Sequence, residues 1–357
     1  MKKFIIILLM VLAIFVLILN CEKPLKLEKA DMEYVKETLG KFAPVTIAYD
    51  KSILSEKDQQ VVDKLIQAAN YMNKIFLGQV FSKNEEIKDA LEKSKNPEDK
   101  PYLELFNIMI GPINRLDKNK LFLGTMPVPK GANYYPEDLT KEEFQQWIKD
   151  HPEDKKNFES EFHIIRREGD ELVAIPYSEA YKDLLNPAAK LLHEAADLSE
   201  NESLKKFLHS RADAFLSNDY FQSDIDWMNL DSQIEVVIGP YEVYEDNLMG
   251  YKAAFESFIC VVDPVESEKL QVVAEYLTDL EKNLPYEEKY KNFKRGGFSP
   301  IKVVQEIYTA GDTRAGVQTL AFNLPNDERV REAKGFKNVL LKNVQEAKFN
   351  KILYCWQ

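Results

Sequence analysis

The segment Ile234–Pro264 constrains the fold most, because two apolar runs in it flank a short polar and aromatic stretch. The first run, Ile234–Ile238, contains β-branched residues and is typical of a buried strand that ends at Gly239-Pro240. The second run, Phe255–Val262, is also apolar. Acidic and tyrosine side chains are crowded between the two runs: Tyr241, Glu242, Tyr244, Glu245 and Asp246. This pattern indicates either a site mounted on rigid strands or an acidic surface turn with packed tyrosines.

The size and charge of the chain limit the classes of protein that it can belong to. With 357 residues, of which 45% are hydrophobic and 30% charged, it can bury a large core in one or two domains. The net charge is −12 and no long basic run is present, so we expect no nucleic-acid partner. Three cysteines and four histidines argue against a disulfide scaffold and against a zinc finger.

The first residues have the pattern of a bacterial lipoprotein signal. Lys2 and Lys3 precede an apolar run, Phe4–Leu19, so residues 1–20 are predicted to be a signal peptide. Cys21 stands where a lipoprotein is cleaved and acylated, although Asn20 replaces the usual small residue before it. We therefore expect a lipid anchor on Cys21 and a place in the cell envelope, on the extracytoplasmic side of a membrane. An uncleaved membrane anchor and another secretory fate remain open.

The rest of the chain predicts a helix-rich α+β lobe over residues 45–352, preceded by a charged tether over residues 21–44. Helical spacing of apolar residues predicts a helix over Ser55–Leu77, and the turn residues after Glu168 predict a hairpin over Phe162–Ile175. Further helices are expected from Pro187 and from the capping box of Ser199. The remaining apolar runs predict strands: Val45–Tyr49, Ile301–Tyr308, Val317–Asn323 and Asn338–Leu341. Together they predict a small, mostly antiparallel sheet or barrel, and residues 353–357 are expected to be irregular.

Two segments resemble a known family. The stretch around Glu242 is similar to the substrate-cleft segment of the dipeptidyl peptidase III family of zinc metallopeptidases. Phe322–Val339, with the sequence FNLPNDERVREAKGFKNV, resembles the asparagine-containing cleft strand of that family. The similarity runs from about Asp50 to about Ile352, and the chain looks closest to the bacterial branch often called zinc-dependent hydrolase. The resemblance implies a helix-rich lobe around a small β-barrel, like the non-catalytic lobe of dipeptidyl peptidase III.

The resemblance also implies a set of substrate-binding residues. Glu242 and Tyr244 match the acidic and tyrosine positions of the cleft, and Asn323 and Asn326 match its two asparagines. A peptide N-terminus is an ammonium with three donors, which one carboxylate and two amide oxygens can satisfy. Tyr244 would be the catalytic residue that donates a hydrogen bond to the developing oxyanion. The expected partners are short peptides bound by their N-terminus; alternatively, the two asparagines only shape the turn around Pro325.

The family needs zinc, but no metal ligand is expected in this chain. In relatives, the histidine–glutamate zinc helix follows the GFKNV segment, and the chain ends before it. His193-Glu194-Ala195-Ala196-Asp197 is similar to HExxH with Asp in the last place, but no third ligand is indicated. No two of the four histidines are four or five residues apart, so the sequence has no histidine pair on one helix face. The sequence therefore predicts no zinc bound by these residues and no cleavage by the route of the family.

Other chemistries have less support. No G-x-S-x-G pattern occurs, and Cys260 lies in an apolar run typical of a core thiol. The leading hypothesis is a dipeptidyl peptidase III-like metallopeptidase that is anchored as a membrane lipoprotein and is inactive because its zinc-binding lobe is absent. The alternatives are a non-catalytic peptide-binding lipoprotein and a hydrolase of another kind on the same scaffold. The sequence leaves the oligomeric state open.

Overall fold

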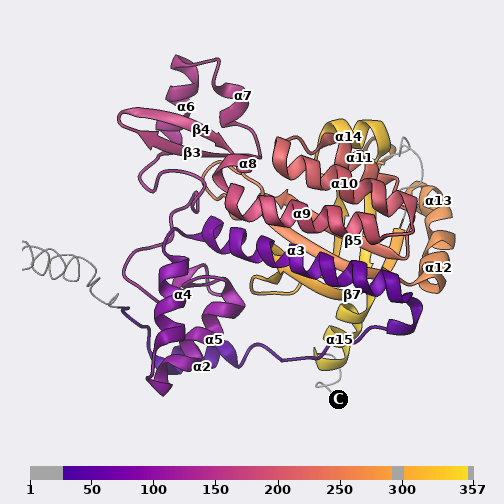
Figure 1. Cartoon of the computed structure of the whole chain (residues 1–357), viewed down its shortest axis with the longest axis horizontal. Coiled ribbons are helices and arrows are strands. Elements are labelled where there is room, and N and C mark those ends of the chain that lie inside the picture. The colour runs from indigo at the N-terminus through magenta and orange to yellow at the C-terminus, as the bar shows by residue number, and fades with distance from the viewer. Residues whose placement is uncertain (1–26, 292–300, 353–357) are drawn as a thin grey trace, which may run out of the picture.

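A computed structural model describes residues 27–291 and 301–352 (Figure 1). The helices of the described residues are α2 (Met32–Leu39), α3 (Glu56–Val80), α4 (Asn84–Lys93), α5 (Lys100–Met109), α6 (Lys141–Asp150), α7 (Lys155–Phe158), α8 (Tyr177–Ala180), α9 (Lys182–Leu198), α10 (Glu202–Ser217), α11 (Phe221–Met228), α12 (Pro264–Glu275), α13 (Leu277–Lys282), α14 (Glu328–Lys334) and α15 (Lys342–Ile352). The strands are β1 (Ile113–Asn114), β2 (Lys120–Leu121), β3 (His163–Glu168), β4 (Glu171–Pro176), β5 (Ile234–Glu242), β6 (Ala254–Val262), β7 (Ile301–Gly311), β8 (Ala321–Leu324) and β9 (Lys337–Leu341). This is the α+β class that the sequence predicts.

A five-stranded sheet in the order β5-β6-β7-β9-β8 forms the centre of the molecule. Its pairs are antiparallel except for β7 and β9, which are parallel, so the sheet is mixed. Its two outer strands approach each other: the amide of Asn326, just after β8, donates a hydrogen bond of 2.9 Å to the carbonyl of Tyr241 in β5. The rings of Phe258 on β6 and Phe322 on β8 also lie 4.5 Å apart. The sheet is therefore curved toward a barrel.

Long helices cover one face of this sheet (Figure 1). Helix α3 contacts β6 and β7, α9 lies beside α3, and α10 lies beside α9. Ser55 begins α3 as predicted, because its hydroxyl and the carboxylate of Asp58 form a capping box. The buried face of α3 includes Leu65, Met72 and Phe76. This packing makes the sheet a rigid base for the loops at its edges.

Two smaller layers flank the sheet. Helices α2, α4 and α5 share a second apolar core, which includes Val35 of α2 and Ala254 of β6. The tether expected over residues 21–44 therefore contains an ordered helix, and the chain packs on the lobe from residue 27 onward. On the other side, the hairpin of β3 and β4 lies with α6 and α7 (Figure 1). The ammonium of buried Lys252 joins this layer to the sheet through the carbonyls of Phe158 and Ser160, at 2.6 and 2.7 Å.

Several expected elements differ from the structure. Residues 45–49 form no strand, although Ile47 and Tyr49 pack against the core. Helix α9 begins before Pro187, which lies inside it. Helix α10 is capped by Asn201, whose side chain accepts from Leu204 N, and not by Ser199. In each case tertiary packing or a neighbouring cap outweighs the local pattern.

The predicted signal peptide and Cys21 lie outside the described residues, as does the irregular end over 353–357. Within residues 27–291 and 301–352, no helix is both long and apolar enough to span a bilayer.

Candidate peptide-binding site at the edge of the sheet

The end of β5 carries the first group of site residues. The strand does not stop at Gly239-Pro240, as the sequence suggested, but continues to Glu242 with an irregularity in its register after Pro240. Gly239 is required here: it has a φ of +149°, and a Cβ at this position would lie 2.8 Å from Nη1 of Arg211. Arg211 is buried and pairs with Asp224 at 2.5 Å. A close contact beneath the strand thus fixes where the segment beginning at Glu242 leaves the sheet.

Glu242, Tyr244 and Asn326 lie together. The carboxylate of Glu242 accepts hydrogen bonds from the amide of Asn326 and from the hydroxyl of Tyr244. Burial raises the pKa of Glu242, and the two hydrogen bonds oppose that shift. The negative charge of Glu242 raises the pKa of Tyr244, whose side chain is 75% exposed. The structure therefore joins three of the four predicted site residues in one hydrogen-bonded group.

Asn323 stands apart from this group. It is exposed on β8, opposite Asn338 of β9, and its amide donates to Asn338 Oδ1 at 2.7 Å. Residue spacing explains the difference, because Asn323 is in the strand and Asn326 follows it beyond Pro325. Asn323 therefore lies on the same edge of the sheet as Asn326, but its side chain contacts the neighbouring strand β9 and not Glu242.

Two acidic residues that the sequence analysis did not single out extend the site. Glu256 is buried on β6, and burial followed by the charges of Asp312 and Glu242 raises its pKa well above the usual range. Asp312 follows β7, and burial followed by the charge of Glu245 raises its pKa to about 7. A glutamate inside the apolar run of β6 was a visible sequence signal for Glu256. No local pattern marks Asp312, whose place depends on the pairing of Glu256 with Gly311.

The loop between β5 and β6 is organised by one carboxylate. Asp246 accepts hydrogen bonds from the hydroxyl of Tyr135, at 2.7 Å, and from four backbone amides. These amides belong to Leu248, Met249, Tyr251 and Lys252, at 2.8–3.1 Å. Because Asp246 lies two residues after Tyr244, the same contacts hold the loop that presents the tyrosine.

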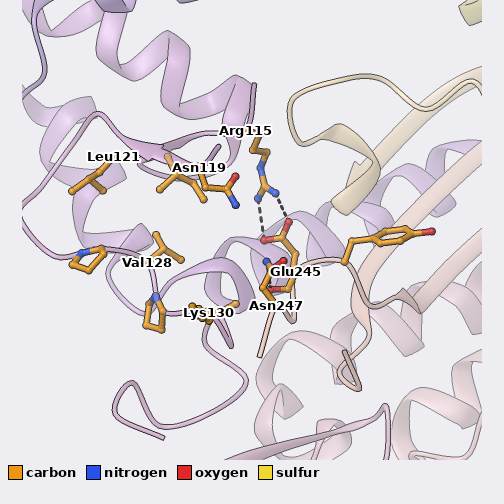
Figure 2. A pocket seen from close by; sticks show the side chains of 12 residues that line it. Arg115, Asn119, Leu121, Val128, Lys130, Glu245 and Asn247 are labelled. Atoms are coloured by element: carbon orange, nitrogen blue, oxygen red, sulfur yellow. Dashed lines mark hydrogen bonds and ion pairs between the residues drawn. The ribbon is translucent and has the colours of Figure 1, made fainter. Parts of the chain in front are cut away.

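A pocket of about 510 Å³ adjoins this loop (Figure 2). Tyr244 and Glu245 line it from the loop, and Arg115, Val128 and Lys130 line it from the helical layer. Arg115 and Glu245 form an ion pair across the pocket wall, which Figure 2 shows with two dashed lines. This pair neutralises Glu245, so the acidic character of the site rests on Glu242, Glu256 and Asp312. The pocket offers mixed apolar and basic surface next to the tyrosine.

The described residues do not form a zinc site of the family type. Across 27–291 and 301–352, no group of three or more His, Cys, Asp or Glu side chains could hold a metal ion. Glu194, in the position that resembles the general base of HExxH, pairs with Lys64 of α3 at 2.6 Å. Cys260 is buried, and burial raises its pKa well above the usual value, as expected of a core thiol.

Known proteins resemble this chain over most of its length. The structure of DPP III from Caldithrix abyssi is similar with a TM-score of 0.87 and 59% identity, covering 89% of this chain and 61% of that one. Dipeptidyl-peptidase III from Corallococcus sp. strain EGB gives a TM-score of 0.85 and 43% identity, covering 91% and 61%. A protein of Arabidopsis thaliana named Nudix hydrolase 3 is 38% identical over 371 residues, which are 89% of this chain and 48% of that protein.

The chain thus spans about half the length of the Arabidopsis relative and about three fifths of each similar structure. The profile of peptidase family M49 matches residues 153–355, which include β5, β6, β8 and the site residues between them. The fold, the order of the elements and the profile agree with the resemblance found in the sequence. The chain belongs to peptidase family M49.

Proposed function

We propose that this chain is the peptide-binding part of a dipeptidyl peptidase III-like metallopeptidase and that it holds short peptides by their free N-terminus. The observation that carries the proposal is the hydrogen-bonded group of Glu242, Tyr244 and Asn326 beside the buried Glu256 and the half-buried Asp312. DPP III from Caldithrix abyssi, at 59% identity, supports the substrate class. We extend the activity and the substrates of these longer relatives to this chain as part of the same proposal.

An ammonium group suits this site chemically. Glu242 supplies a carboxylate, and the amide of Asn326 is held in place by Tyr241 O and by Glu242. Loss of hydration and neighbouring negative charges disfavour the ionised carboxylates, which is why the pKa values of Glu256 and Asp312 are raised; for Asp312 the charge of Arg115 opposes the shift. A bound ammonium would compensate them, so these residues favour a cationic ligand over a neutral one. Asn323 would contact the peptide farther along the sheet edge, as the family resemblance implies.

The exposed tyrosine gives the bound peptide a direction. The hydroxyl of Tyr244 donates to the carboxylate of Glu242, and the tyrosine also lines the 510 Å³ pocket. A peptide with its N-terminus at Glu242 would therefore pass Tyr244 and extend toward Val128 and Lys130. When the peptide ammonium takes the place of the hydroxyl at Glu242, the single O–H of Tyr244 is free to donate to a carbonyl oxygen of the bound chain, which would stabilise a developing oxyanion if that carbonyl were attacked.

We also propose that residues 1–357, tested on their own, do not cleave peptides by the zinc route. The four histidines stand at positions that lack the helical histidine pair of the family motif. The chain would act in the cell envelope as a lipoprotein anchored through Cys21, since a charged segment and an apolar run precede that cysteine. Two signals are needed for stable anchoring of a lipidated protein, so diacylation of Cys21 is expected to matter more than any surface contact.

The binding proposal is tested by calorimetry with the full chain, a tetrapeptide with a free N-terminus and the same peptide after N-acetylation. We expect the free peptide to bind and the acetylated one to bind at least tenfold more weakly. Glu242→Gln should weaken binding about 10- to 100-fold, because hydrogen bonds to charged groups contribute roughly 1.5–3 kcal/mol. Asn323→Ala should weaken it as well.

The matched control is Glu332→Gln, which removes an exposed carboxylate on α14 outside the site. Unchanged binding in Glu242→Gln and Asn323→Ala would overturn the ammonium-binding proposal. Cleavage is tested separately with a dipeptidyl naphthylamide and added zinc. Release of the dye by the purified chain would refute the proposal that residues 1–357 do not cleave peptides by the zinc route. Membrane anchoring is tested by detergent partition of wild type and Cys21→Ser, which should lose the lipid and move to the aqueous phase.

A further inference from the structure

Two histidines that are far apart in the sequence face each other across α9 and α10. Nδ1 of His193 lies 2.9 Å from Nδ1 of His209, and the ring centroids are 5.2 Å apart. The two helices are joined only by Ser199–Asn201 and lie side by side (Figure 1). The sequence spacing gave no hint of this pair, because the two residues are on different helices.

Each imidazole has a carboxylate near its outer nitrogen. The carboxylate comes from the opposite helix, four residues after the histidine of that helix. Nε2 of His193 lies 3.4 Å from Oδ1 of Asp213, and Nε2 of His209 lies 3.5 Å from Oδ1 of Asp197. The arrangement is nearly symmetric, since each helix supplies one histidine and one aspartate four residues later. Each carboxylate is a strong acceptor and therefore favours the tautomer that carries its proton on Nε2.

That tautomer leaves both Nδ1 atoms with lone pairs directed at each other. Two acceptors at 2.9 Å repel unless a proton or a metal ion lies between them. Histidines that bind metals commonly donate the other ring N–H to a carboxylate, and that is the place of Asp213 and Asp197 here. The two imidazoles and two carboxylates thus have the layout of a two-nitrogen metal site, with a carboxylate within 3.5 Å of each outer ring nitrogen.

We propose that His193 and His209 bind one divalent transition-metal ion of the zinc, nickel or copper class between their Nδ1 atoms. Imidazole nitrogen suits these metals, whereas magnesium and calcium prefer oxygen ligands. Two nitrogens on a tetrahedral zinc lie about 3.3 Å apart, so the rings need to separate by only about 0.4 Å. Water fills the remaining positions, because an open pocket of about 320 Å³ lies beside His193 and Asp197.

Neighbouring charges fit this assignment. Glu194 is turned toward Lys64 and Lys190, at 2.6 and 3.9 Å, and is not needed as a ligand. The site is on the helical face and uses none of the peptide-binding residues. Its role would be to fasten α9 to α10, because an ion that binds only the folded arrangement stabilises it in proportion to its occupancy.

The test uses the full chain, Zn²⁺ in calorimetry and Cu²⁺ in electron paramagnetic resonance. We expect one zinc equivalent, a higher melting temperature with zinc, and copper hyperfine coupling to two imidazole nitrogens. His193→Gln and His209→Gln should each lower affinity at least tenfold and leave coupling to a single nitrogen. Asp197→Asn and Asp213→Asn should lower affinity about tenfold, as loss of carboxylate partners does at other sites.

The control is His151→Gln, which removes a half-buried histidine stacked on Trp147 and far from the pair in sequence. It should bind metal like the wild type, and circular dichroism should show all variants folded. Equal binding by wild type and the His193→Gln/His209→Gln double variant would overturn the proposal. So would an absence of binding together with nitrogen NMR shifts that show only a proton shared between the two rings.

Discussion

The amide of Asn326 donates a 2.9 Å hydrogen bond to the backbone carbonyl of Tyr241, and this contact joins the two outer strands of the sheet next to Glu242. The contact places Asn326, which follows β8, beside Glu242 at the end of β5. Because the same amide also contacts Glu242, Asn326 has a structural role and, in the proposed peptide site, a binding role as well. The two roles can be measured independently, one through protein stability and the other through peptide affinity.

Asn326→Leu should lower both stability and peptide affinity. Loss of the bond to Tyr241 O should cost about 1–2 kcal/mol in the free energy of unfolding, measured by urea denaturation. Peptide affinity should fall roughly 10- to 100-fold, since a hydrogen bond to a charged group is lost as well. In the control, Asn229→Ala removes a 2.8 Å amide-to-carbonyl bond at Ile225 and should leave peptide binding unchanged. Full affinity in Asn326→Leu would show that the amide does not serve the ligand.

Peptide binding should depend on pH through Asp312. Its pKa is raised to about 7, so the carboxyl is largely protonated below pH 7 and charged above it. Affinity for an ammonium should therefore rise through pH 7 and fall again as the peptide amine, with a pKa of about 8, loses its proton. Asp312→Asn should remove the rise on the acidic side. Calorimetry at a series of pH values from about 5.5 to about 9 measures peptide affinity as a function of pH.

Glu306 provides the control for that profile. Burial also raises its pKa to about 7, but it hydrogen-bonds Gln318 and does not belong to the Glu242 group. Glu306→Gln should keep the pH dependence of binding. The free energy of unfolding should change with pH in the direction opposite to peptide affinity. A carboxyl whose pKa is raised by folding keeps its proton to a higher pH in the folded chain than in the unfolded chain. Stability therefore falls as pH rises from about 4 to 7. Both variants should reduce that fall, and a binding profile altered equally in both would contradict the assignment to Asp312.

Gly311→Ala should be strongly destabilising. This glycine has a φ of +70°, and a Cβ there would lie 2.0 Å from the carbonyl oxygen of Phe255. Strain in the backbone and displacement of β6 together should cost more than about 2 kcal/mol. The control is Gly169→Ala in the β3–β4 turn, which has a similar φ of +65° but open space around it. It should cost about 1 kcal/mol. Equal losses in denaturation would mean that the approach to Phe255 is unimportant.

The buried triad of Glu235, Lys337 and Lys302 should dominate the stability of the far end of the sheet. Lys337 and Lys302 lie 3.2 and 2.8 Å from the carboxylate, and Glu235 and Lys337 are each only 1% exposed. Glu235→Ala leaves a buried ammonium without its partner and should cost about 3–5 kcal/mol. Asp89→Ala, which breaks an exposed 2.8 Å pair with Lys93, should cost less than about 1 kcal/mol.

A double variant sharpens this prediction. Glu235→Met combined with Lys337→Met removes both buried charges, and it should be less destabilising than the two single changes added together. Strict additivity in chemical denaturation would show that the two groups do not interact. Lys337 also lies over the ring of Trp227 at 4.1 Å, so methionine at this position keeps part of its packing.

Local sequence patterns predicted the elements better than they predicted the site. The helical spacing of apolar residues after Ser55 and the apolar run from Ile234 predicted α3 and β5 correctly. Helix α5 was not predicted, although Tyr102, Leu105, Phe106 and Met109 recur at helical spacing. Pro187 is typical of a helix start, but in α9 it lies inside the helix.

The site residues required information that spacing does not contain. Glu242 and Asn326 are far apart in the sequence, and only the family resemblance brought them together before the structure did. Asp312 and the His193–His209 pair depend on strand register and helix packing, which arise from long-range contacts. Glu256 is the exception, since a lone carboxylate inside an apolar strand is visible in the sequence itself.

The five hydrogen bonds of Asp246 would determine how the proposed site meets a peptide. They fix the loop after Tyr244 during folding, so the conformational entropy of that loop is already lost when a peptide arrives. Recognition then needs little rearrangement of the backbone, and selectivity between ligands depends on charge and fit. A carboxylate that never touches the peptide would in this way set how sharply the site discriminates.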